Sequence, residues 1–153
     1  TEQMVRGWVD NLALSPFSSD TKAIQAIAAG QCDVAIVNTY YLGRLQQQDP
    51  AYPVAIFWPN QGGSGVHVNI SGAGITRHAK HPEEARKLLE WLSSAEAQAM
   101  FAGVNAEFPA KTGVALDPLV AAWGEFTADQ LNVAEAGRLQ ADAIRLMDRA
   151  GYR

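Results

Sequence analysis

A short apolar run between two segments with helical patterns limits the folds open to this chain. Residues 32–38, CDVAIVN, are mostly apolar and β-branched, as in a strand that helices cover on both faces. The preceding segment 20–30 has helical spacing, with Asp20 expected as its N-cap and Gly30 just past its end. The following segment, 39–48, also has the pattern of a helix. Helix, strand and helix joined by short connections predict an α/β fold.

Further segments along the chain fit the same architecture. Residues 53–58 and 66–75 have the composition or the alternation of strands. Pro82 predicts a helix that begins there, and Ser93 with Glu96 predicts a capping box at the start of the next helix. Most of the C-terminal tail is also expected to be helical.

Composition and charge argue against several classes of protein. The chain has 153 residues, of which 48% are hydrophobic and 18% charged, a globular composition. Its net charge is -4 and it has no cluster of lysine and arginine, so no nucleic-acid partner is expected. No apolar run approaches the roughly 18 residues that span a bilayer. No catalytic triad order or zinc-protease motif is present, so the sequence predicts no enzyme.

Tyr40 and Tyr41 stand side by side where the first apolar run ends. Adjacent side chains at the start of a helix diverge by about 100°, so both phenols can face the carboxyl edge of the sheet, where open α/β folds bind ligands. A phenolate is a hard oxygen donor that suits a highly charged cation such as ferric iron, provided that the metal displaces the phenol proton. The pair alone leaves open a more ordinary arrangement, with one core tyrosine and one surface tyrosine.

Other polar residues near this edge have weaker signals. Asp20 is a candidate anion contact, although its ordinary role at that position is to cap a helix. The glycine-rich segment 62–65 lacks the lysine and the following helix of a phosphate loop, so it is interpreted as a hinge or crossing loop. His78 and His81 precede a helix and do not share one of its faces, which predicts solvated loop residues. His67 lies near the crossing loop, with nothing further to support a role.

Four segments of the chain resemble, in order and with similar spacing, the ferric-ion-binding periplasmic proteins of bacterial ABC iron transporters. These segments are AIAAGQCDVAIVNTYYLGRL, FWPNQGGSGVHVNISGAGITRHAKHPEEARKLLEWLSSAEAQAMFA, NAEFPA and ADAIRLMDRAGY. The resemblance implies a class II periplasmic-binding-protein fold, in which three-layer α/β lobes close on a ligand. It also implies that Tyr40 and Tyr41 are phenolate ligands of Fe(III). Asn38 would then help to hold a synergistic anion such as carbonate.

Members of that family are roughly twice as long as this chain, so the chain is expected to be a C-terminal half with part of the metal site. Residues 1–64 plus 106–153 would form the tyrosine-bearing lobe, and residues 65–105 would be a crossing segment that belongs to the other lobe. Such a piece would expose apolar helix faces around Leu88, Leu89 and Leu92. A missing N-terminal half or a second copy of the chain is expected to cover them.

The predicted function is therefore capture of Fe(III) in the periplasm as the solute-binding component of an ABC iron importer. The expected partners are the ferric ion and the permease in the inner membrane. One alternative keeps the fold and changes the ligand to an oxyanion or a small organic solute. Another makes the chain the effector-sensing domain of a transcription regulator, and a third makes it a fragment that binds nothing.

Overall fold

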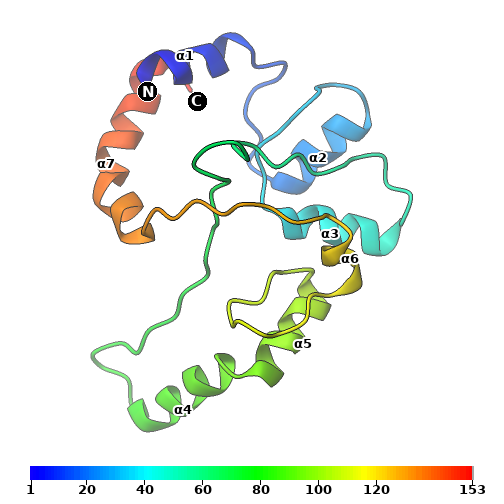
Figure 1. The fold of residues 1–153 in the computed structure, drawn as a ribbon. Helices are drawn as coiled ribbons and strands as arrows, with labels where there is room; N and C mark the ends of the chain where they lie inside the picture. The colour runs from blue at the N-terminus through cyan, green and yellow to red at the C-terminus, as the bar shows by residue number, and fades with distance from the viewer. Residues whose placement is uncertain (153) are drawn as a thin grey trace.

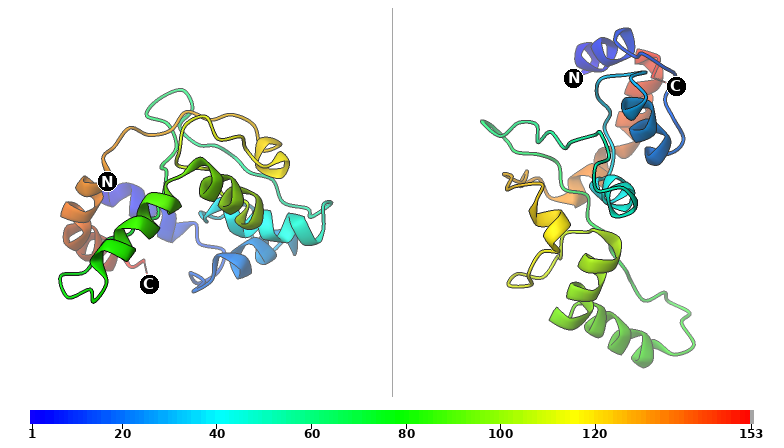
Figure 2. Two further views of the ribbon diagram at one scale, coloured as in Figure 1. Left: turned by 90° about the horizontal axis from the view of Figure 1, so that it is seen from below. Right: turned by 90° about the vertical axis from the view of Figure 1, so that its right-hand side faces the viewer.

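The computed structural model describes residues 1–152, and the regular structure of this part is helical (Figures 1 and 2). The helices, in chain order, are α1 (Glu2–Asp10), α2 (Asp20–Ala28), α3 (Thr39–Gln48), α4 (Pro82–Leu92), α5 (Ala95–Asn105), α6 (Pro118–Ala121) and α7 (Val133–Ala150). No helix within residues 1–152 combines the length and the hydropathy needed to cross a membrane.

The first predicted strand, residues 32–38, is wrong as a sheet element. The segment forms no ladder, and the side chains of Val34 and Ile36 are 80% and 88% exposed. Backbone groups of a strand need partners on a neighbouring strand, and none lies beside this segment in the described part of the chain. Its apolar composition predicted burial on both faces, but without neighbouring strands and covering helices the side chains stay exposed.

The other two predicted strands also remain unpaired, apart from one bridge. Residues 53–58 alternate between exposed and half-buried positions, as in a strand, but Phe57 is 82% exposed and no ladder forms. Within 66–75, a single parallel bridge joins Val66 to Ala128. The order of segments agrees with the α/β prediction, and within residues 1–152 the predicted strands form a single bridge.

Two extended connections meet at this bridge. The Val66 backbone N–H donates to the Thr127 carbonyl (2.9 Å), and the Asp129 N–H donates to the Val66 carbonyl (2.8 Å). The preceding residue, Gly65, has φ +89°, and a Cβ built there would lie 2.5 Å from the Thr127 carbonyl oxygen. The predicted crossing loop thus ends on a residue that must be glycine for the two connections to approach so closely.

Helix α3 begins at Thr39, as predicted, but the N-cap of α2 differs from the prediction. Asp20 has helical geometry as the first residue of α2, and Ser19 is the N-cap. The Ser19 hydroxyl accepts from the Lys22 backbone N–H at 3.5 Å. Because Ser19 already caps the helix, the Asp20 carboxylate is released for a contact elsewhere.

Helix α4 begins at Pro82, as predicted, whereas the cap of α5 is Ser94 instead of Ser93. Ser93 ends α4 with helical backbone angles, and its hydroxyl donates to the Leu89 carbonyl (3.0 Å). An N-cap needs extended backbone angles, which Ser94 has, and the Ser94 hydroxyl accepts from the Ala97 N–H (3.2 Å). The predicted capping box between Ser93 and Glu96 is therefore wrong.

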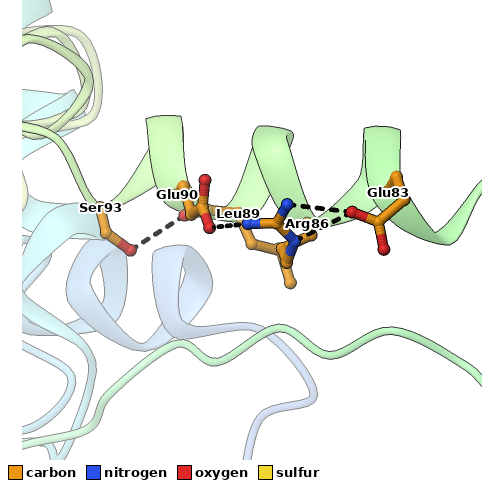
Figure 3. A network of polar contacts seen from close by, with 5 residues as sticks. All are labelled: Glu83, Arg86, Leu89, Glu90 and Ser93. Carbon is orange, nitrogen blue, oxygen red and sulfur yellow. Dashed lines mark hydrogen bonds and ion pairs between the residues drawn. The ribbon is translucent and has the colours of Figure 1, made fainter.

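The outer face of α4 is solvated and charged (Figure 3). Arg86 lies between Glu83 (2.9 Å) and Glu90 (2.5 Å). No side chain of α4 is buried, and Leu88 is 54% exposed. The expected exposure of apolar surface on this helix is present at Leu88, while Leu89 is half-buried.

Aromatic side chains join α3 to the segment that follows α5. Trp58 stacks on Phe126 with ring centroids 4.5 Å apart, and Phe108 meets Phe126 edge to face at 5.3 Å. The Trp58 Nε1–H donates to the Trp123 carbonyl (3.0 Å). Gly43 of α3 faces Ala106 and the Trp123 ring, so α3 is held close to this cluster.

At the other end of the molecule, α1 lies against α7, with the N-terminus and the last described residues close together (Figure 1). Helix α5 contacts both α3 and α4. The division into a lobe of residues 1–64 plus 106–153 and a crossing segment 65–105 stays a prediction.

Candidate metal centre

The first turn of α3 carries the tyrosine pair. The ring centroids of Tyr40 and Tyr41 are 4.3 Å apart, with the ring planes tilted by 38°. Both residues are half-buried, so neither is a core residue. The pair therefore presents two adjacent oxygen donors from one helix turn.

Arg44 lies one turn further along α3 and covers both rings. Its guanidinium carbon is 5.4 Å from the centroid of the Tyr40 ring and 5.7 Å from that of Tyr41. A guanidinium over an aromatic face is attracted by the ring quadrupole. Arg44 was not predicted as a site residue, although its spacing of four and three residues from the tyrosines is the spacing of helix neighbours.

The pKa of Tyr40 is raised above its ordinary value. The largest cause is the hydrogen bond with Tyr41, followed by burial and by the negative charges that Tyr41 and Asp20 bring near it. The positive charge of Arg44 acts in the opposite direction. Tyr40 is thus a neutral phenol in the iron-free protein at neutral pH, and a cation must displace its proton in order to bind.

Asp20 and Asn38, the two candidate anion contacts, lie against each other. Both the backbone N–H and the side-chain Nδ2 of Asn38 donate to Oδ2 of Asp20, at 3.0 and 3.2 Å. Asn38 is the N-cap of α3, but its side chain makes no capping bond. Its Oδ1 instead accepts from Nδ2 of Asn69 at 3.0 Å. Asn69 was not predicted from the sequence, because a contact over 31 residues between polar side chains has no local pattern.

The three histidines do not add a metal cluster to this site. His67, His78 and His81 are all exposed. Within residues 1–152, no group of three or more histidine, cysteine, aspartate or glutamate side chains lies close enough to hold a metal ion. A metal site within residues 1–152 would therefore take its ligands from the tyrosine pair.

The chain is similar to bacterial solute-binding proteins. A family model described as bacterial extracellular solute-binding protein matches residues 2–128. The chain belongs to this family. Its fold is that of a class II periplasmic binding protein, of which the chain covers about half.

Curated relatives carry names that refer to iron. The chain is 45% identical over 160 aligned residues to iron uptake protein A2 of Synechocystis sp., with 99% of this chain and 46% of that protein covered. It is 26% identical to the major ferric iron-binding protein of Neisseria meningitidis, with 90% of this chain and 42% of that protein covered. The chain therefore spans less than half the length of these relatives.

Solved structures agree with this relationship. A Trichodesmium protein in complex with iron and citrate ligands matches with a TM-score of 0.92 and 43% identity, covering 99% of this chain and 50% of that protein. The ferric binding protein from Campylobacter jejuni matches with the same TM-score at 32% identity, with the same coverage of both chains. The expected half-length match is confirmed.

Proposed function

We propose that this chain captures Fe(III) as part of the solute-binding component of a bacterial ABC iron importer. The observation that carries the proposal is the close pair of phenols on the first turn of α3, Tyr40 and Tyr41, with ring centroids 4.3 Å apart. The iron-related names of the relatives support the same ligand. The proposed activity is binding and release, without chemical conversion of the ligand.

The chemistry of capture follows from the donor pair. Each phenol loses its proton when the metal binds, since the phenolate is the form that ligates. Two adjacent phenolates repel each other, and a trivalent ion offsets that repulsion. The pair supplies two donors, and we assign the remaining donors to the part of the family fold that this chain does not cover. Release follows when the lobes open.

We also propose that a synergistic anion such as carbonate binds at the start of α3. The N-terminus of α3 has no side-chain cap, because Asn38 uses its side chain on Asp20 and Asn69. Uncapped backbone N–H groups at a helix N-terminus favour an anion. Asn38 would border that anion, and Asp20 would hold Asn38 in place while its own negative charge favours the cation.

The proposed setting is the periplasm, with the permease in the inner membrane as the partner that accepts the loaded protein. A complementary N-terminal half, or a second copy of the chain, would complete the site and cover the exposed apolar surface. Residues 1–64 plus 106–153 are proposed as the tyrosine-bearing lobe, with 65–105 as the crossing segment. The relatives, about twice as long, support this arrangement.

Titration of the chain with ferric citrate tests the proposal. Charge transfer from phenolate to Fe(III) is expected to produce a visible absorption band, which the Tyr40→Phe/Tyr41→Phe double variant loses. Tyr152→Phe, which changes a tyrosine outside the site, is the matched control and should keep the band. Absence of a band in the parent chain would contradict iron capture by this chain. Citrate binding that the tyrosine substitutions leave unchanged would favour the organic-solute alternative.

A further inference from the structure

Three polar side chains from separate segments meet at the start of α3. Asp20 is the first residue of α2, Asn38 directly precedes α3, and Asn69 lies in the long connection between the bridge and α4. Asp20 accepts from the backbone and side chain of Asn38 (3.0 and 3.2 Å), and Asn38 accepts from Asn69 (3.0 Å). The result is a continuous chain of hydrogen bonds, Asp20 to Asn38 to Asn69.

The direction of these bonds follows from the chemistry of the end residue. An ionised carboxylate can only accept, so Asn38 must turn its NH₂ group toward Asp20. Its carbonyl oxygen then faces Asn69, which must donate from its own NH₂ group. The orientation of both amides is thereby determined, and bonds in such a chain polarise one another.

The parallel bridge between Val66 and Ala128 restrains the backbone that leads to Asn69. Val66, three residues earlier, is bonded through both its N–H and its carbonyl to residues 127 and 129. Gly65 allows this close approach, since a side chain there would meet the Thr127 carbonyl. The two extended connections and the start of α3 are therefore linked through Asn69.

We propose that Asn69 is a positioning residue for the tyrosine pair. Its amide fixes the side chain of Asn38, and the backbone carbonyl of Asn38 accepts from the Tyr41 N–H (3.3 Å) in the first turn of α3. Movement of the connection that carries Asn69 would then be transmitted to the phenols. The role in iron binding rests on the proposed function, whereas the restraint on α3 is a property of the iron-free protein as well.

Hydrogen–deuterium exchange on the iron-free chain tests the restraint. Asn69→Ala should raise the exchange rate of the backbone amides of Asn38 and Tyr41, which donate to Asp20 and to the Asn38 carbonyl, by about three- to tenfold, the effect of one hydrogen bond. Ser71→Ala, an exposed polar residue two positions along, is the matched control and should leave these rates unchanged. Asn69→Asp keeps the shape of the side chain but places a carboxylate oxygen, an acceptor, against the Oδ1 acceptor of Asn38. It should therefore act like Asn69→Ala, and it replaces that variant if the alanine substitution causes misfolding.

Iron release tests the consequence for the site. After loading with ferric citrate, Asn69→Ala should release iron to a chelator about three- to tenfold faster than the parent, as judged by decay of the visible band. Asn38→Ala and the Asn69→Ala/Asn38→Ala double variant complete a double-mutant cycle. The double variant should release iron no faster than Asn38→Ala alone, a non-additivity that general destabilisation would not produce.

The outcomes separate this inference from the proposed function. Exchange rates at Asn38 and Tyr41 that are equal in Asn69→Ala, Asn69→Asp and Ser71→Ala would overturn the positioning role, whether or not the chain binds iron. Additive effects in the cycle would overturn it too. Faster exchange in a chain that shows no visible band would retain the restraint on α3 and refute iron capture instead.

Discussion

The phenol rings of Tyr40 and Tyr41 lie with their centroids 4.3 Å apart on one turn of α3. A helix start allows this, since consecutive side chains there diverge by only about 100°. In the iron-free state the interaction with Tyr41 raises the pKa of Tyr40, which favours the protonated form of Tyr40. Tyr40 is thus a neutral phenol at neutral pH and becomes an anionic donor when a cation displaces its proton.

The stability of the iron-free chain is expected to fall at alkaline pH because of Tyr40. The pKa of Tyr40 in the folded chain is raised, chiefly by its hydrogen bond with Tyr41, above the value of about 10 that applies to the unfolded chain. Between about pH 10 and the folded pKa, the unfolded chain has lost this proton and the folded chain has not. The free energy of unfolding therefore decreases as the pH rises through that range, and Tyr40 adds no pH dependence below it.

Tyr41→Phe isolates the cause of this effect. The substitution removes the hydrogen bond that raises the pKa of Tyr40, so this pKa should move down toward its ordinary value. Titration of tyrosinate by ultraviolet absorbance measures the shift, and urea unfolding at several alkaline pH values measures the smaller loss of stability. Tyr152→Phe removes a tyrosine outside the pair and is the control. An unchanged titration of Tyr40 in Tyr41→Phe would show that the two phenols do not interact.

Arg44 is expected to ease iron loading at neutral pH. Its guanidinium lies within 6 Å of both ring centroids. Its positive charge partly offsets the other effects, which raise the pKa of Tyr40. Arg44→Met keeps an apolar stem over the rings and removes the charge, so the pH at which half of the visible iron band forms should rise. Arg77→Met, which removes an exposed arginine away from the pair, should leave that pH unchanged. A lower midpoint in Arg44→Met would mean that repulsion of the ferric ion outweighs stabilisation of the phenolates.

Local signals predicted the helices of this chain well. Thr39 and Pro82 start α3 and α4 as expected, because helix starts depend on residues within one turn. The errors at the caps were shifts by one residue, from Asp20 to Ser19 and from Ser93 to Ser94. Choosing between neighbouring capping residues requires the backbone angles, which the composition of the segment does not determine.

The sheet and the polar contacts of the site could not be predicted in the same way. An apolar run such as 32–38 has the composition of a buried strand, but pairing depends on residues far away in the sequence, and residues 1–152 provide one bridge. The tyrosine pair was found because both residues are adjacent in sequence. Asn69 contributes through one long-range hydrogen bond, so only the folded arrangement reveals it.

The packing of α3 against the aromatic cluster should tolerate no side chain at Gly43. A Cβ there would collide with Cβ of Ala106 and lie 3.1 Å from Cη2 of Trp123. Gly43→Ala should therefore lower the free energy of unfolding by about 1–3 kcal/mol, the usual cost of overpacking, despite the better helix propensity of alanine. Gly137→Ala in α7, where nothing lies within 4 Å, is the matched control. It should raise the same free energy by roughly 0.5–1 kcal/mol in urea unfolding, and equal effects at both positions would refute the close contact.

The exposed apolar residues of the unpaired extended segments should make the chain associate. Ile36 and Phe57 are 88% and 82% exposed, and each lies in a segment without strand partners. Unpaired backbone groups beside apolar side chains favour pairing with another chain, and burial of each side chain contributes roughly 1.5–3 kcal/mol. Sedimentation of the isolated chain should therefore show a mass that increases with concentration, and Ile36→Lys/Phe57→Lys should reduce that increase. Met100→Lys/Val104→Lys places the same two charges at exposed positions of α5 and should leave the association unchanged. A monomer at every concentration would mean that these segments need no second copy or complementary half to cover them.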